Sequence, residues 1–182
     1  MVVSGFARGV DRESHRAALS VREDGGALRG DTIAVLGSGL LAPYPSDQPD
    51  LLRRIEREGL VLSEFPVESH AARENFPRRN RILSGISEAV LVIEAGSASG
   101  SLITARWAID QGKEIFALPG RVDSPMSQGC HELLQRSEGT LVTSPRDILA
   151  GLGVTAPQEA PQVHANFGRP SIGWNGGRFG IA

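Results

Sequence analysis

The run Thr32-Ile33-Ala34-Val35-Leu36-Gly37-Ser38-Gly39 decides the fold of this chain, because an apolar, β-branched stretch leads directly into a glycine-rich loop. Strands that are apolar along their whole length are typical of parallel sheets with helices on both faces. A helical pattern from Asp47 to Glu58 follows this strand and its loop. The unit therefore has the order strand, loop and helix.

The same order recurs on both sides of this unit. The predicted strands are Val2 to Val3, Thr32 to Leu36, Leu60 to Phe65, Ala89 to Ile93, Glu114 to Leu118 and Thr140 to Thr143. The predicted helices are Asp11 to Leu19, Asp47 to Glu58, Pro77 to Ile86, Ser101 to Gln111, Gln128 to Arg136 and Pro145 to Leu149. This alternation predicts an α/β fold with a doubly wound, mostly parallel sheet. It also predicts one domain over residues 1–152, followed by a Pro/Gly-rich tail or linker over residues 153–182.

Composition and charge exclude several classes of protein. The chain has 40% hydrophobic and 22% charged residues in 182 positions and no membrane-length apolar run, and we expect no signal peptide. The single cysteine, Cys130, cannot form an intramolecular disulfide, which agrees with a cytoplasmic location. No paired metal-ligand spacing occurs, so we expect no metal. The net charge of −2 argues against a generally basic nucleic-acid coat, so any site for a polyanion must be local.

The one clear concentration of positive charge runs from Arg73 to Arg81, with four arginines against a single glutamate. At about 100° per residue, the helix predicted from Pro77 turns Arg79 into its apolar sector, with Arg78 beside that sector. Arg79 is therefore either paired inside the protein or lining a crevice. Basic side chains beside a helix N-terminus favour phosphate. The alternative is a solvated basic helix start with one arginine extending over the core.

Phe76 adds an aromatic ring to this basic segment. A ring held beside arginines can stack on a base of a single strand, whatever the base is. Alternatively, Phe76 is a hydrophobic staple that packs on the helix after it. The sequence leaves both interpretations open.

Small-residue loops follow three of the predicted strands and should lie at one edge of the sheet. They are Ser4 to Gly9, Gly37 to Leu40 and Gly96 to Ser101. Glycine lets the backbone approach a ligand closely, and successive amides form an anion-binding nest. None of the loops carries a dinucleotide or triphosphate fingerprint, so this edge predicts phosphate binding without a metal or a fixed cofactor. The alternative for any single loop is that a tight turn needs its glycine for structural reasons.

Conventional catalytic groups are sparse. Glu64 and Glu94 follow strands, where a general acid or base could stand, but acids at such places also cap helix termini. No serine is placed as an activated nucleophile, and Cys130 has no visible activating partner. Catalysis therefore has little support from the residues.

Several segments together carry a resemblance to a known family. They are Val2 to Asp11, Leu36 to Leu40 with Tyr44 and Pro45, Ser63 to Pro66, Phe76 to Gly85, Ser99 to Ala105 and Ala117 to Gly120. In this order and spacing they resemble the DNA-processing protein A family, also called DprA or Smf, over about residues 1–150. The resemblance implies a Rossmann-like, cytoplasmic, bacterial binding protein rather than an enzyme. Such a protein protects incoming single-stranded DNA, commonly forms a homodimer and loads the RecA recombinase in natural transformation.

Carried over by position, the resemblance also implies a site for DNA or phosphate. Its residues are Gly37, Ser38, Gly39, Arg73, Phe76, Arg78, Arg79, Asn80, Ser99, Gly100 and Ser101. No catalytic residue, metal ligand or cofactor is implied.

One departure from the family pattern concerns the start of the chain. In the family, a strand with a phosphate-binding loop and its helix precede the segment that matches Val2 to Gly5, and this sequence lacks both. A sheet without a central strand exposes unpaired backbone. Either the chain is an N-terminally truncated reading of a longer gene, or another segment or subunit completes the sheet.

Two other functions stay open. The first is hydrolysis of the N-glycosidic bond of a nucleoside monophosphate by a related Rossmann-like family, although Ala95 to Arg106 lacks the acid that such enzymes use. The second is a structural fragment that binds nothing.

Overall fold

The computed structural model of the chain describes residues 1–21 and 31–155. Strands and helices alternate in the order β1 (Val2–Ser4), α1 (Val10–Ser20), β2 (Thr32–Leu36), α2 (Pro49–Glu58), β3 (Leu60–Ser63), α3 (Asn75–Gly85), β4 (Ala89–Val92), α4 (Gly100–Asp110), β5 (Glu114–Ala117), a 3-10 turn (Pro125–Ser127), α5 (Gln128–Gln135), β6 (Thr140–Leu141) and α6 (Pro145–Gly151). Every predicted strand and helix has a counterpart in this order. Most of the predicted tail, residues 156–182, lies outside the described residues.

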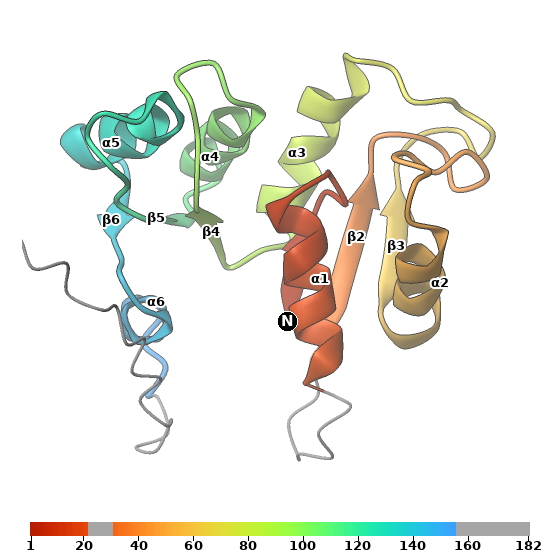
Figure 1. Ribbon diagram of the computed structural model, residues 1–182, viewed down its shortest axis with the longest axis horizontal. Coiled ribbons are helices and arrows are strands. Elements are labelled where there is room, and N and C mark those ends of the chain that lie inside the picture. Colours follow the sequence, from red (N-terminus) through yellow and green to blue (C-terminus); the bar gives the residue numbers. More distant parts are fainter. Residues whose placement is uncertain (22–30, 156–182) are drawn as a thin grey trace, which may run out of the picture.

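The strands form two parallel sheets (Figure 1). One sheet has the order β1-β2-β3, with Val3 opposite Ile33 on the neighbouring strand, and the other has the order β4-β5-β6. Helix α3 lies between the two sheets in Figure 1 and connects β3 of the first sheet to β4 of the second. It packs against α4. No ladder joins β1 to β4 among the described residues. The predicted single sheet is thus divided into two three-stranded sheets, with β1 and β4 as edge strands.

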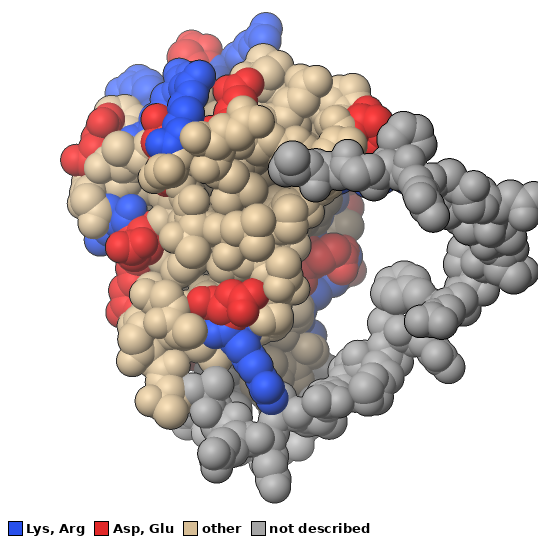
Figure 2. Space-filling view, turned by 90° about the vertical axis from the view of Figure 1, so that its left-hand side faces the viewer, with Lys and Arg blue, Asp and Glu red and all other residues tan. Residues whose placement is uncertain are grey.

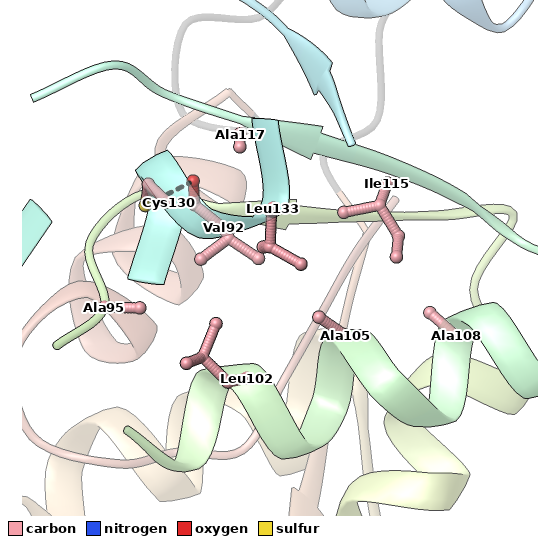
Figure 3. Packing of buried hydrophobic residues seen from close by; sticks show 9 residues of the cluster. All are labelled: Val92, Ala95, Leu102, Ala105, Ala108, Ile115, Ala117, Cys130 and Leu133. Carbon is pink, nitrogen blue, oxygen red and sulfur yellow. Dashed lines mark hydrogen bonds between the residues drawn. The ribbon is translucent and has the colours of Figure 1, made fainter. Parts of the chain in front are cut away.

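Each sheet has its own apolar core. Figure 3 shows the core of the second sheet, where β4, β5, α4 and α5 contribute Val92, Ile115, Leu102 and Leu133. Cys130 belongs to this cluster and is 1% exposed, and its thiol donates to the carbonyl oxygen of Val92. The core of the first sheet is built from Phe6, Leu19, Ala34, Leu36, Leu51, Leu52 and Ile55.

Two helices begin two residues away from the predicted start. Helix α2 begins at Pro49 rather than Asp47, because a proline suits the first turn of a helix, where its missing N–H is not needed. Helix α3 begins at Asn75, two residues before Pro77. Phe76 therefore lies inside the first turn and does not precede the cap, the position that a hydrophobic staple requires.

A buried histidine joins α1 to the first sheet. The hydroxyl of Thr32 donates to the carbonyl oxygen of Val2 at 3.0 Å, so its oxygen accepts the proton of His15 Nδ1, 2.6 Å away. His15 Nε2 is then the unprotonated nitrogen, and it is buried without a hydrogen-bond partner in the described structure. Protonation would place an unpaired charged N–H there. Burial accordingly lowers the pKa of His15 from 6.5 to about 4, against the opposing effect of Asp11.

We expect this histidine to make folding sensitive to mild acid. The unfolded chain takes up the proton near pH 6.5, whereas the folded chain takes it up near pH 4, so stability is full above pH 6.5. Below that pH the free energy of unfolding should fall by up to about 1.4 kcal/mol per pH unit. Urea unfolding between about pH 7.5 and pH 5 measures this loss. His15→Gln should reduce the slope, and an unchanged slope would contradict the assignment.

The edge strand β4 exposes apolar side chains. Leu91 is 39% exposed and Ile93, just after the strand, is 41% exposed. Exposed apolar edge strands favour association, and a lysine placed on such an edge opposes it. We expect Leu91→Lys to lower self-association measured by light scattering. Val122→Lys is the control, because Val122 is 92% exposed and lies outside the strands. Association that persists unchanged in Leu91→Lys would show that this edge is not responsible.

Candidate nucleic-acid interface

Arg79, in the first half of α3, is the buried cation that the helical pattern predicts. It is 5% exposed, and its Nη1 donates to the carbonyl oxygen of Gly5 at 2.7 Å and to that of Val35. Burial lowers its pKa to about 10, with Asp11 opposing the shift, so the guanidinium stays charged at neutral pH. No carboxylate forms an ion pair with it in the described part of the chain.

Asn80 extends these contacts to the second sheet. Its Oδ1 accepts from Arg79 Nε at 3.1 Å, and its Nδ2 donates to the carbonyl oxygen of Gly100 at 3.3 Å. Gly5 follows β1, Val35 lies near the end of β2, and Gly100 begins α4 after β4. These two side chains of α3 therefore link the residue after β1, the last part of β2 and the start of α4, as the loop positions predict.

A pocket of about 220 Å³ opens beside Arg79. Among the described residues, its lining contains two arginines, an aromatic pair and no acid: Gly5, Ala7, Arg8, Tyr44, Pro45, Phe76 and Arg79. The rings of Tyr44 and Phe76 have centroids 5.8 Å apart and are tilted by 53°. The guanidinium carbon of Arg79 lies 6.0 Å from the centroid of Phe76. The pocket thus combines an aromatic surface with positive charge.

The loop Gly37 to Gly39 is buried, and Gly37 lies against the ring of Phe76, which lines the pocket. A Cβ at Gly37 would come within 2.7 Å of the Phe76 ring, and one at Gly39 within 2.1 Å of the carbonyl oxygen of Pro66. Close packing therefore accounts for both glycines. The hydroxyl of Ser38 is buried and has no hydrogen-bond partner in the described structure.

Of the predicted site residues, Phe76 and Arg79 line the pocket, whereas Gly37 to Gly39 and Asn80 do not. The remaining five also lie outside its lining. Arg73 is exposed, and Arg78 lies over the ring of Phe65, 5.8 Å from its centroid. Ser99 caps α4 by accepting a hydrogen bond from the amide of Ser101. Among this group, only Gly100 is linked to the pocket, through Asn80 and Arg79.

Arg8 and Tyr44 line the pocket, although the predicted site does not include them. Both lie in segments that carry the family resemblance, and Arg8 also lies in a loop predicted at the binding edge of the sheet. These two features of the sequence could have placed both residues in the predicted site. Local periodicity could not select them, because the side chains meet only through the tertiary arrangement of the loops.

Charge elsewhere on the molecule is mixed. On the side of the molecule seen in Figure 2, basic and acidic side chains are interspersed around an uncharged area. Residues 1–21 and 31–155 contain no cluster of His, Cys, Asp or Glu that could hold a metal ion. No helix in the described part of the chain is long and apolar enough to cross a membrane.

Comparison with known proteins extends over most of the chain. The family described as DNA recombination-mediator protein A matches residues 1–153. Protein Smf of Escherichia coli (strain K12) is 47% identical over 152 residues, which are 83% of this chain and 38% of that protein. DNA processing protein DprA of Streptococcus pneumoniae is 43% identical over 150 residues, which are 82% of this chain and 50% of that protein. The chain thus spans half or less of the length of these relatives.

Solved structures agree with the sequence matches. The X-ray structure of DprA from Streptococcus pneumoniae has a TM-score of 0.72 at 42% identity, over 82% of this chain and 50% of that one. DNA processing protein A of Helicobacter pylori, studied for its single-stranded DNA binding mode, has a TM-score of 0.65 at 25% identity, over 83% and 78% of the two chains. The α/β, Rossmann-like fold is thereby confirmed. Sequence and structure together show that this chain belongs to the DNA recombination-mediator protein A family, also known as DprA or Smf.

Proposed function

We propose that this chain binds single-stranded DNA at the pocket beside Arg79, with little preference for sequence. The observation that carries the proposal is the buried charge of Arg79, whose hydrogen-bond acceptors are all uncharged. Buried charges are normally paired, and here an anion at the pocket would provide the missing partner. A phosphate group fits this role, because a guanidinium offers it a planar set of donors.

The aromatic pair, Tyr44 and Phe76, favours binding of single-stranded DNA over binding of duplex DNA. Stacking on Phe76 or Tyr44 requires an unpaired base whose face is accessible. The pocket of about 220 Å³ is smaller than the range of about 300–1,000 Å³ that encloses a whole drug-sized ligand. It therefore suits one ring of a longer polymer that continues over the surface. Phosphate and ring contacts carry little sequence information, which explains the expected lack of preference.

The remaining site residues extend this proposal. Arg73, Arg78 and the start of α4 at Ser99 to Ser101 would contact neighbouring phosphates along the strand. Family membership supports a wider role in which the protein protects incoming DNA, forms a homodimer and loads a RecA-type recombinase in natural transformation. A cytoplasmic location belongs to the same proposal.

Hydrolysis of a nucleoside monophosphate gains no support from the pocket. In the part of the chain that the structure describes, its lining contains no Asp or Glu that could act as the general acid.

Binding can be tested by fluorescence anisotropy with a labelled oligothymidylate and with a duplex of the same length. We expect tighter binding of the single strand, with affinity that falls steeply as salt rises. Equal affinity for the two forms of DNA, or no binding of the single strand below about 50 mM salt, would contradict the proposal.

A further inference from the structure

An acidic residue pairs with Arg8 of the pocket, although the lining contains no acid among the described residues. Asp47, just before α2, has a half-exposed carboxylate that is bound by two arginines. Arg12 Nη1 donates to Asp47 Oδ2 at 3.2 Å, and Arg12 Nη2 donates to Oδ1. Arg8 Nε donates to the same Oδ2, also at 3.2 Å. The hydrogen bond from Arg12 is the main cause that lowers the pKa of Asp47 to about 2, so the carboxylate is charged at neutral pH.

Arg12 depends on the ion pair with Asp47 more than Arg8 does. The side chain of Arg12 is 7% exposed, its guanidinium carbon lies 5.8 Å from the centroid of the Phe6 ring, and Asp47 is its one ion-pair partner in the described structure. The side chain of Arg8 is 67% exposed and forms a single hydrogen bond to Asp47. A buried ion pair is costly to break, whereas an exposed pair contributes little. Arg8 can therefore exchange its partner, and Arg12 cannot.

We infer that Arg8 is a second phosphate ligand of the pocket, and that Asp47 sets the affinity by competing with the phosphate for Arg8. This inference rests on the proposed binding of single-stranded DNA. Arg8 and Arg79 both line the pocket, so their guanidinium groups can contact the backbone next to a base stacked on Phe76. When the strand binds, Arg8 moves from Asp47 to a phosphate, and Asp47 stays paired with Arg12.

The first test compares Arg8→Ala with Arg53→Ala. Arg53 is a matched control, because its side chain is 66% exposed and its Nη2 lies 3.1 Å from Asp50, but it lies on α2 away from the pocket lining. Arg8→Ala should weaken oligothymidylate binding by roughly fivefold, the size of one exposed charge-assisted contact. It should also reduce the slope of the logarithm of affinity against the logarithm of salt concentration by about 0.7. Equal effects of the two substitutions would overturn the inference.

The second test is a double-mutant cycle with Asp47→Asn, which keeps one oxygen for Arg12. The substitution should raise affinity by about two- to fivefold in the wild-type background, and most of this gain should vanish in Arg8→Ala. A gain of the same size in both backgrounds would mean that Asp47 acts through general electrostatics and not through Arg8. Thermal melting checks that Asp47→Asn is folded, and the comparison of Arg8 with Arg53 decides the inference if it is not.

These tests separate the inference from the proposed function. If the wild-type chain binds the oligonucleotide and Arg79→Ala does not, the proposed site stands whatever Arg8→Ala does. If the wild-type chain does not bind, both the proposed function and this inference are wrong.

Discussion

Arg79→Ala should weaken binding of single-stranded DNA by about 10- to 100-fold, the range for losing a hydrogen bond to a charged group. The guanidinium is buried beside the pocket, so its removal leaves Arg8 as the one arginine in the described lining. Loss of one phosphate contact should also reduce the slope of the logarithm of affinity against the logarithm of salt concentration by about 0.7. Anisotropy titrations with oligothymidylate at several salt concentrations measure both effects.

Two other arginines serve as controls for this substitution. Arg81 lies two residues further along α3 and pairs with Glu64, and Arg136 has a side chain that is 62% exposed. Removing either one changes the net charge equally, but we expect no more than about a twofold loss of affinity, as for exposed charges. If all three substitutions act alike, binding is diffuse electrostatics and the pocket is not the site.

Arg79 also has a structural role, which must be separated from binding. Its removal leaves the carbonyl oxygens of Gly5 and Val35 without that donor, at a cost of about 1–3 kcal/mol for each unsatisfied group. Binding is therefore compared at a temperature where urea unfolding shows the variant to be folded. Arg79→Lys keeps the charge but cannot reach both carbonyls and a phosphate, so its affinity should fall between those of wild type and Arg79→Ala.

Phe76→Leu should weaken single-strand binding by about 5- to 100-fold, because leucine removes the surface on which a base stacks. The ring lines the pocket, packs over Gly37 and faces Tyr44. Leucine keeps most of the apolar contact, so the loss of stability should stay below about 1.5 kcal/mol. Anisotropy and thermal melting on the same samples separate the two effects.

Phe65→Leu is the matched control for this substitution. Phe65 is also partly buried with an arginine, Arg78, over its ring, but it does not line the pocket. Its substitution should leave affinity nearly unchanged. A fall in melting temperature with full affinity in Phe76→Leu would assign Phe76 to packing alone.

Local patterns predicted the fold class and the position of the central arginine. The period of an α-helix turned Arg79 into the apolar sector of α3, and the structure confirms that its side chain is buried. The apolar run Thr32 to Leu36 predicted β2 with the observed bounds. Both predictions depend on residues close in sequence, where a single helix or strand sets the geometry.

Contacts between distant segments could not be predicted in this way. The glycines of Gly37 to Gly39 suggested an anion-binding nest, but their need for glycine arises from Phe76 and Pro66, which lie far along the chain. Arg8 reaches the pocket through a loop in which Phe6 has a φ of 58° and Gly9 a φ of 88°, a path that no hydrophobic period reveals. Asp47 was predicted to lie in a helix and instead pairs with Arg12 and Arg8.

The most direct test of the central claim is an NMR titration of the isotopically labelled chain with oligothymidylate, which maps the amides that respond to the strand. We expect the largest shifts at the pocket, in Gly5 to Arg8, at Tyr44 and in Phe76 to Asn80. We expect little change at the opposite ends of β5 and β6, near Lys113 and Gly139. Shifts that spread evenly over exposed basic residues, or that gather away from Arg79, would show that the strand does not bind at this pocket.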